Sequence, residues 1–192
     1  MAESLPDGWA TGVTVVQLNG GVSLNRRSGG AAGLAVTIAQ RASGHVSLLP
    51  SPAILERVET KQAIEADRTV AAVLVEAAEA QAFLFTAGPC DASSAHVENG
   101  YLSASDVEEL ARRGAVGDVL GRYIDADGNI VDPQLDARTV GVDLGRLRAA
   151  KRSIFVTAGD AKHDIARTVV TSGLCSVLVT DETTARALLE ER

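Results

Sequence analysis

The sequence has 192 residues, of which 46 % are hydrophobic and 3 % aromatic, and a formal net charge of −7 at pH 7. That length can bury one sizeable core made mostly of Ala, Val, Leu and Ile, a composition typical of α/β proteins whose covered strands read as aliphatic runs. An acidic chain without a basic stripe is a poor nucleic-acid binder by itself, and two distant cysteines, Cys90 and Cys175, argue against a disulfide framework.

Neither a membrane span nor a signal peptide is expected. No apolar segment is long enough to cross a bilayer, and Met1–Trp9 lacks the apolar core that a signal peptide needs. We therefore expect a soluble, cytoplasmic protein with reduced cysteines. Residues 1–12 are expected to form a frayed lead-in, and residues 13–192 to form one domain.

In the first half of the chain, expected strands alternate with expected helices. Val13–Leu18 is the first strand, and it ends in Asn19-Gly20-Gly21 before a helix that Ser28–Gly33 opens and that runs through Ala42. A strand, a glycine-rich loop and a helix can offer backbone N–H groups to an anion, although the glycines could equally close a tight turn. Neither a Walker ending nor a G-x-G-x-x-G motif is present. The following expectations are a strand at Val46–Leu49 stopped by Pro50-Ser51-Pro52, a mixed and charged stretch at Ile54–Ala66, a helix at Arg68–Glu79, and a strand at Ala82–Thr86 that leads into Ala87-Gly88-Pro89.

The stretch Gly114–Gly128 organises the second half. A helix that Ser105 caps, with Glu108 as capping-box partner, is expected to stop at Gly114. The apolar run Val119–Ile124 reads as a strand, and Asp127-Gly128 as a hairpin turn that returns the chain through Asn129–Val131. The later strands are expected at Thr139–Val142, Ile154–Ala158 and Val177–Val179. The later helices are expected from Asp143 to Leu147 and from Lys162 to Thr171, the second stopped by Gly173. A last helix is expected to be capped by Thr180-Asp181 and to dock on the core through Ala185, Leu188 and Leu189.

This alternation predicts an α/β fold, an open and mostly parallel sheet with helices on both faces plus one β-hairpin. Ligands of such sheets bind beyond the carboxyl ends of the strands. At those ends the sequence places Asn19-Gly20-Gly21, Pro50–Pro52, Gly88, Asp118 and Gly159–Lys162. Asp118 could be a turn residue or an acceptor for ligand hydroxyls. Lys162 could be a solvated lysine, or could share a phosphate with the helix that follows it.

The sequence contains no obvious catalytic or metal-binding set. The histidines His45, His96 and His163 lack ligand spacing, and His96 reads as a solvated residue of the loop Cys90–Gly100. No nucleophile with its base, and no carboxylate pair, stands at matching positions. We therefore expect a binding module without catalytic residue, metal or cofactor, and not an enzyme.

Several blocks, in order along the chain, resemble SorC-type sugar-binding domains, the effector-sensing halves of bacterial transcription regulators. The blocks are Val15–Gly21, Leu49–Ala53, Ala115–Gly128, Gly141–Leu147, Gly159–Lys162 and Leu178–Leu189. The resemblance implies a Rossmann-like fold similar to that of sugar-phosphate isomerases. It also implies an effector, a sugar or sugar phosphate, that modulates operator binding and oligomerisation. The ligand-binding residues that it implies are Lys162 for the phosphate and Gln17, Asn19, Gly20, Gly21, Pro52, Gly88, His96 and Asp118 around the sugar.

The sequence also departs from this family. It shows no helix-turn-helix, so operator DNA is expected to be bound only through one that lies outside it, and the family's first strand–loop–helix unit is expected to be absent. Asp160, two residues before Lys162, would compete with a phosphate, which leaves room for a non-phosphorylated sugar. The resemblance predicts a homodimer or homotetramer. Alternative hypotheses are a sugar-phosphate isomerase-like enzyme with Asp118 as base, and a dinucleotide-binding module.

Overall fold

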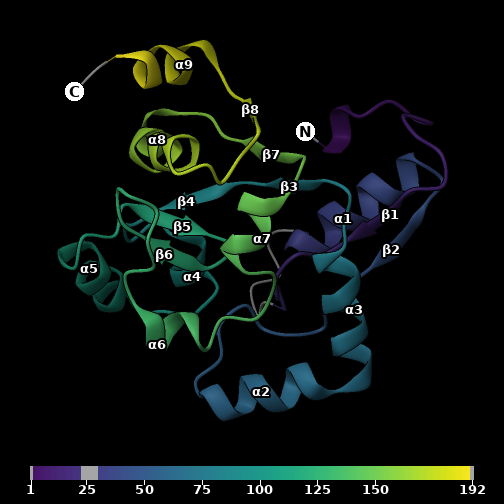
Figure 1. Ribbon diagram of the computed structural model, residues 1–192, viewed down its shortest axis with the longest axis horizontal. Helices are drawn as coiled ribbons and strands as arrows, with labels where there is room; N and C mark the ends of the chain where they lie inside the picture. The colour runs from purple at the N-terminus through teal and green to yellow at the C-terminus, as the bar shows by residue number, and fades with distance from the viewer. Residues whose placement is uncertain (1, 23–29, 191–192) are drawn as a thin grey trace. The chain divides into compact units, whose positions relative to one another are not determined.

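Short strands and helices alternate along the chain, as the sequence predicts (Figure 1). The structure is a computed structural model that describes residues 2–22 and 30–190. It divides into two compact units. Unit 1 consists of residues 1–80 and 140–142, and unit 2 of residues 81–139 and 143–192.

Unit 1 is built on one pair of parallel strands. β1 (Thr14–Val16) pairs with β2 (His45–Ser47), and α1 (Gly30–Arg41) connects them and packs on both. After β2 come α2 (Val58–Ala66) and α3 (Arg68–Ala78). Leu49, Val70 and Val140 form a buried cluster against which partly buried aliphatic side chains from α2 and α3 pack. This strand–helix–strand unit is the arrangement that the aliphatic runs of the first half predict.

The first residues of unit 1 are ordered against α1 and are not the frayed lead-in that we expected. η1 (Ala2–Ser4) buries Ala2, and the Arg41 side chain donates to the carbonyl of Leu5 at 2.5 Å. The indole nitrogen of Trp9 donates to the carbonyl of Ile38 at 3.3 Å. The predicted opening of α1 at Ser28 lies outside the described residues, and the described part of the helix begins at Gly30.

One helix of unit 1 was not predicted from the sequence. The mixed stretch 54–66 contains α2, whose N-cap Arg57 has no side-chain capping bond and which buries none of its residues. A helix without a cap signal or a continuous apolar face gives no periodic pattern to detect. By contrast α3 begins where expected, because the Asp67 carboxylate accepts from the backbone N–H of Thr69 at 2.9 Å.

Unit 2 contains a parallel sheet in the order β3-β7-β8. Its strands are β3 (Phe83–Phe85), β7 (Ser153–Val156) and β8 (Val177–Val179). The register pairs Phe85 with Phe155, whose rings stack with centroids 5.3 Å apart. The helix α8 (His163–Thr171) precedes β8, and α9 (Glu182–Leu189) follows it. With the parallel pair of unit 1, this sheet confirms the predicted α/β class with mostly parallel strands.

Unit 2 also has an antiparallel sheet, β4-β5-β6. β4 (Ala87–Pro89) pairs with β5 (Gly117–Val119), which pairs with β6 (Arg122–Ile124). The prediction of one strand over Val119–Ile124 is wrong, because the chain reverses at Leu120 and Gly121, with φ of 54° and 84°. Positive φ at both loop residues suits a tight hairpin, but leucine is an unusual residue there and the apolar run concealed the turn. The hairpin predicted at Gly128 also forms, since the N–H of Asp125 donates to the carbonyl of Asn129 at 2.9 Å.

The remaining elements of unit 2 are short helices. They are α4 (Ala95–Glu98), α5 (Ala104–Arg112), α6 (Pro133–Asp136), α7 (Leu144–Ala149) and the 3₁₀ turn η2 (Asp160–Lys162). α5 starts two residues earlier than expected, because the capping box is formed by Ser103 and Asp106 instead of Ser105 and Glu108. Both pairs match the same pattern, so the sequence could not rank them.

Two further predictions are corrected. The expected strand Thr139–Val142 is a single bridge, in which Gly141 pairs with Asn19. In α9 Leu189 is 84 % exposed and does not dock as expected, whereas Ala185 and Leu188 are half-buried and Thr184 is buried. The caps predicted for α7 and α9 are confirmed, with Asp143 and Asp181 each accepting from a backbone N–H.

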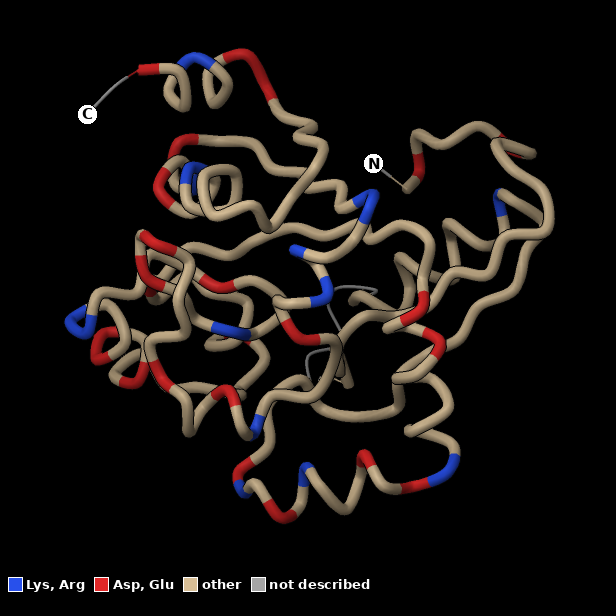
Figure 2. Tube along the Cα trace, in the orientation of Figure 1, with Lys and Arg blue, Asp and Glu red and all other residues tan. Residues whose placement is uncertain are grey.

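Acidic and basic residues follow one another along α2 and at the start of α3, as the red and blue segments of Figure 2 show. Within α2, Lys61 pairs with Glu65 at 2.9 Å. Within the part of the chain that the structure describes, no helix has the length and apolar character needed to cross a membrane.

Candidate functional site

The carboxylate of Asp118 is the centre of the candidate site. Asp118 is the middle residue of β5 and is only 7 % exposed. Its Oδ2 atom accepts two hydrogen bonds, from the backbone N–H of Gly121 at 3.0 Å and from Nε2 of His96 at 3.1 Å. The turn after β5 therefore folds back on the carboxylate that precedes it, and the sequence Gly-Asp-Val-Leu-Gly supplies both the acid and its backbone donor.

Gly88 is required opposite this carboxylate. In the β4–β5 register Gly88 is the direct partner of Asp118. A Cβ atom on residue 88 would lie 2.3 Å from Oδ1 of Asp118, which no real contact of these atoms allows. Among the described residues none donates a hydrogen bond to Oδ1. The site thus presents one engaged and one open carboxylate oxygen.

His96 is buried and is not the solvated loop residue that its sequence context indicates. It lies in the first turn of α4, is 8 % exposed, and its ring lies 6.1 Å from that of Tyr101 and 6.0 Å from that of Tyr123. Ser94 caps α4, and its hydroxyl is 3.2 Å from the hydroxyl of Tyr123. This fixed surrounding brings together His96 and Asp118, which are 22 positions apart.

The pKa of His96 reflects two opposing effects. Burial lowers the pKa of the imidazole, but its hydrogen bond to Asp118 and the negative charge of that residue together outweigh burial, so the pKa of His96 is raised above its ordinary value. The protonated form of the ring is therefore favoured beside Asp118. A raised histidine pKa beside a buried acid is typical of functional sites, although structural ion pairs show it too.

The site offers no nucleophile at neutral pH. Burial, with Asp118 and Asp91 nearby, raises the pKa of the Cys90 thiol to about 11. Burial is also the main reason why the pKa of Tyr123 is raised. Both groups stay protonated at physiological pH, and a thiol is unreactive in that form. Among the described residues no group of three or more His, Cys, Asp or Glu side chains is placed to hold a metal ion.

Lys162 lies in a turn that packs against β4, the strand that carries Gly88. The turn is shaped by Asp181, whose Oδ2 accepts from the N–H of Gly159 at 2.9 Å. Within the described residues no ion pair involves Lys162. Asp160, the expected competitor for a phosphate, has a side chain that is 84 % exposed and lies 3.6 Å from the ring of His163. The lysine and the buried carboxylate are thus both carried by elements next to β4.

The other predicted ligand residues belong to unit 1. Gln17 is buried, its Nε2 donates to the carbonyl of Asn19 at 2.8 Å, and its Oε1 accepts from the N–H of Leu49 at 3.3 Å. A Cβ atom on Gly20 would lie 2.1 Å from the carbonyl oxygen of Pro52, and the N–H of Gly21 donates to Ser51. These contacts join the ends of β1 and β2 through their loops. A role in ligand binding stays a prediction for all five residues, which are Gln17, Asn19, Gly20, Gly21 and Pro52.

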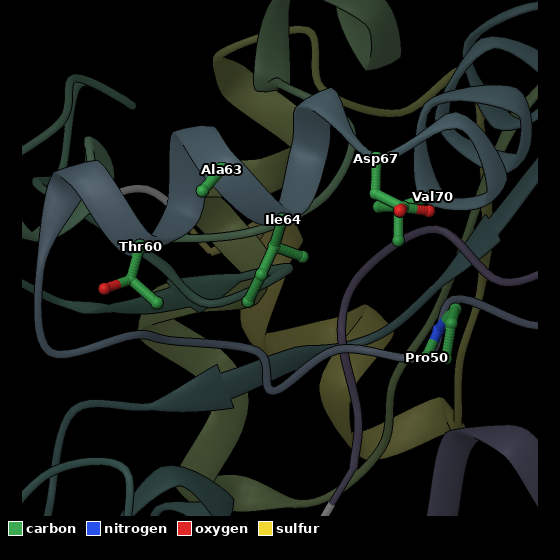
Figure 3. A pocket seen from close by; sticks show the side chains of 6 residues that line it. All are labelled: Pro50, Thr60, Ala63, Ile64, Asp67 and Val70. Carbon is green, nitrogen blue, oxygen red and sulfur yellow. The ribbon is translucent and has the colours of Figure 1, made fainter.

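A pocket of about 410 Å³ opens in unit 1 (Figure 3). It is lined by Thr60, Ala63 and Ile64 of α2, by Pro50, and by Asp67 and Val70 at the start of α3. In Figure 3 the side chains of Thr60 and Ile64 point to the same side of α2. Pro50 belongs to the loop Pro50-Ser51-Pro52 that follows β2. One Asp67 oxygen already caps α3, and the lining offers no cation for a phosphate.

Sequence reasoning missed the groups that support Asp118. Ser94, Gly121 and Tyr123 were not among the predicted ligand residues. The local sequence of His96 reads as a solvated loop, although the resemblance to SorC-type domains places His96 and Asp118 around the same sugar. The one usable signal was the glycine at the end of the strand that precedes the loop, since a glycine in a strand marks a close approach.

The domain has an α/β fold, a carboxylate oxygen of Asp118 that is open to a ligand, and Lys162 in a turn packed against the neighbouring strand β4. These features define a class of protein, a binding domain for a small polar molecule. The family whose description reads "Putative sugar-binding domain" has a model that matches residues 1–190. The chain belongs to this family of sugar-binding domains.

The comparisons with individual proteins agree with this assignment. The chain is 31 % identical over 191 residues to the deoxyribonucleoside regulator of Bacillus subtilis, covering all of this chain and 61 % of that protein. In structure it is similar to a DeoR family transcriptional regulator from Listeria monocytogenes, with a TM-score of 0.88 and 22 % identity over 98 % of this chain and 74 % of that one.

A second solved structure is the full-length sorbitol operon regulator SorC of Klebsiella pneumoniae, with a TM-score of 0.87 and 23 % identity over 98 % of this chain and 62 % of that one. Its similarity confirms the Rossmann-like fold and the predicted SorC-type resemblance. The chain spans about three fifths of the length of the Bacillus regulator, so what the whole relatives do concerns more than this domain.

Proposed function

We propose that the chain is the effector-binding domain of a bacterial transcription regulator and that it binds a sugar or a phosphorylated sugar. The observation that carries this proposal is the open Oδ1 atom of Asp118, the carboxylate oxygen that has no hydrogen-bond partner among the described residues. An ionised oxygen accepts hydrogen bonds and donates none, which suits the hydroxyl groups of a sugar. Membership of a sugar-binding family supports the same ligand class.

Lys162 is the proposed phosphate ligand. It lies in the turn that leads into α8, so an anion bound there would meet both the ammonium and the N–H groups of the helix start. Asp160 points its exposed carboxylate toward His163, which leaves Lys162 available. A non-phosphorylated sugar would use Asp118 and leave Lys162 solvated.

In the proposed protein, binding at this domain changes the affinity of a DNA-binding segment for its operator in the cytoplasm. The formal net charge of −7 makes the chain a poor partner for DNA by itself, so the proposal assigns operator contact to another segment. The subunits are proposed to associate as dimers or tetramers, because regulators that read symmetric operators need paired subunits.

The test is calorimetric titration of the purified chain with 2-deoxyribose 5-phosphate, ribose 5-phosphate and fructose 6-phosphate, and with the same sugars without phosphate. Asp118→Ala should weaken the best binder by about 1.5–3 kcal/mol, the range for hydrogen bonds to a charged group. Lys162→Met should weaken only phosphorylated ligands. Asp127→Ala and Lys151→Ala, which remove exposed charges, are the matched controls and should bind as the wild type does.

An isomerase-like enzyme remains the second candidate, because the structure places a histidine beside the carboxylate. In that case Asp118 would act as a base on a sugar phosphate. Both imidazole nitrogens are buried, however, and Nε2 is committed to Asp118, so His96 presents no nitrogen to a ligand for a second proton transfer. Conversion of any panel sugar phosphate by the purified chain, followed by NMR, would overturn the binding-domain proposal. Thermal stabilisation without conversion supports it.

A further inference from the structure

The two hydrogen bonds on Asp118 are unevenly placed. Both donors, the Gly121 N–H and His96 Nε2, bind Oδ2, whereas Oδ1 lies over the bare Cα of Gly88. A carboxylate held by a single donor could rotate and exchange its oxygens. Here the two donors come from different elements, the β5–β6 turn and α4, so rotation would break both bonds.

His96 itself cannot turn away from this position. Its carbonyl accepts from the N–H groups of Tyr101 and Leu102 at 2.9 and 3.2 Å, and its own N–H donates to the Ser94 hydroxyl at 3.3 Å. On one side its ring faces Gly121, where an added Cβ would be in ordinary contact with the imidazole at 3.6 Å. The ring is held by backbone bonds and by packing.

The remaining ring nitrogen, Nδ1, is buried and has no hydrogen-bond partner among the described residues. A ligand in the site could therefore reach neither nitrogen of His96. Whatever His96 contributes to binding must pass through the carboxylate that it holds.

We propose that His96 is a positioning residue, which locks Oδ2 of Asp118 so that Oδ1 alone is presented over Gly88 to a hydroxyl group of the ligand. This inference rests on the proposed function. It makes the site selective for a hydrogen-bond donor at Oδ1 and unfavourable there for a phosphate, which must bind at the Lys162 end.

The titratable groups around the His96 ring determine how the pairing of His96 with Asp118 responds to pH. They are Asp118 on β5, Tyr123 on β6 and Tyr101 after α4, and Cys90 and Asp91 after β4 lie near Tyr123. Cys90 and Tyr123, whose pKa values are raised, stay neutral through pH 8. As the pH rises through the raised pKa of His96, the ring loses its charge but keeps its Nε2–H bond. Ligand affinity should then fall modestly without the site collapsing.

Two substitutions of His96 separate positioning from bulk. His96→Gln can keep an N–H donor but cannot titrate, and His96→Leu keeps volume but removes the donor. Calorimetric titrations at pH 6, 7, 8 and 9 with the best-binding panel sugar should show roughly tenfold weaker binding for His96→Leu, the scale of one hydrogen bond to a charged group. His96→Gln should bind within about threefold of the wild type at pH 8, with affinity independent of pH. Wild-type affinity for His96→Leu, or an unchanged pH profile for His96→Gln, would overturn the proposal.

A second measurement needs no ligand and keeps the two proposals distinguishable. The imidazole nitrogens of His96 are followed by NMR against pH in the wild type and in Asp118→Asn. The midpoint should be above the ordinary histidine value in the wild type and should drop when the carboxylate is neutralised. An identical midpoint in both proteins refutes the positioning role. If no panel sugar binds the wild type, the proposed function fails, and the NMR result alone decides the pairing of His96 with Asp118.

Discussion

Replacing Gly88 by Ala perturbs the candidate site at its tightest point. The new Cβ would lie 2.3 Å from Oδ1 of Asp118, so the two atoms must separate by about 1 Å to reach an ordinary contact. The carboxylate cannot move that far without losing its bonds to Gly121 and His96. Overpacking costs about 1–3 kcal/mol and a weakened bond to a charged group about 1–2 kcal/mol, so we expect a loss of about 2–5 kcal/mol in unfolding free energy.

The assay is a double-mutant cycle measured by urea denaturation and thermal melting. For a domain of this size the expected loss corresponds to roughly 5–15 °C in Tm. In the Asp118→Ala background the clash is gone, and Gly88→Ala should be neutral or stabilising by about 0.5–1 kcal/mol, because glycine is unfavourable within a strand.

Gly117→Ala is the matched control for this cycle. A Cβ there would lie 2.4 Å from the Gly88 carbonyl oxygen and 2.7 Å from Ile165, so it should destabilise the protein whether or not Asp118 is present. If removing the Asp118 side chain fails to relieve Gly88→Ala, or relieves Gly117→Ala equally, the packing of Oδ1 over Gly88 is refuted.

Four further predictions follow from the same structure. Ser103→Ala should cost about 1 kcal/mol of unfolding free energy and Ser105→Ala less than about 0.5 kcal/mol, since only Ser103 caps α5; equal costs in urea denaturation would contradict the assigned cap. Cys90 should react with iodoacetamide at pH 7.5 roughly a hundredfold more slowly than an ordinary thiol, because its pKa is about 11; peptide mass spectrometry measures the rate, and alkylation at the rate of free cysteine would exclude the buried thiol. Gly33→Ala within α1 should stabilise the protein by about 0.5–1 kcal/mol in thermal melts, because nothing lies within 4 Å of the added Cβ, and destabilisation would show that this helix face is covered. His96, whose folded pKa is raised, adds stability that is fully present below its unfolded pKa of about 6.5 and lost as the pH rises through the folded pKa; melts from pH 5 to 9 should show this loss for the wild type, and a similar loss for His96→Gln would assign it to another group.

The parts of the fold that follow from local sequence were predictable. Aliphatic runs located β1, β2, β3, β7 and β8, and carboxylates at helix starts located α7 and α9, because capping by Asp143 and Asp181 depends only on neighbouring residues. Gly114 and Gly173 were recognised as helix ends, and both have positive φ.

The parts that depend on distant contacts were not predictable. The hairpin turn at Leu120 runs against residue preference, and it forms because both β5 and β6 are buried on either side of it. His96 looked solvated because its burial comes from Tyr101, Tyr123 and Gly121, whose approach no local pattern encodes. Asp118 was singled out from the sequence as a ligand residue, and that role stays a prediction. Its partner and the identity of its free oxygen needed coordinates.

Asp181 links two segments through one carboxylate. One oxygen holds the N–H of Gly159 at 2.9 Å, and the other holds the N–H of Thr184 in the first turn of α9. At the other end of that helix, the guanidinium of Arg167 donates to the carbonyls of Ala187 and Leu188. A hydrogen bond tolerates about half an ångström of stretch. A larger shift of the Gly159–Lys162 turn must therefore either move α9, which Arg167 holds at its other end, or break the bond between Gly159 and Asp181. A movement of the turn that carries Lys162 would thereby be transmitted to α9, the last helix of the chain.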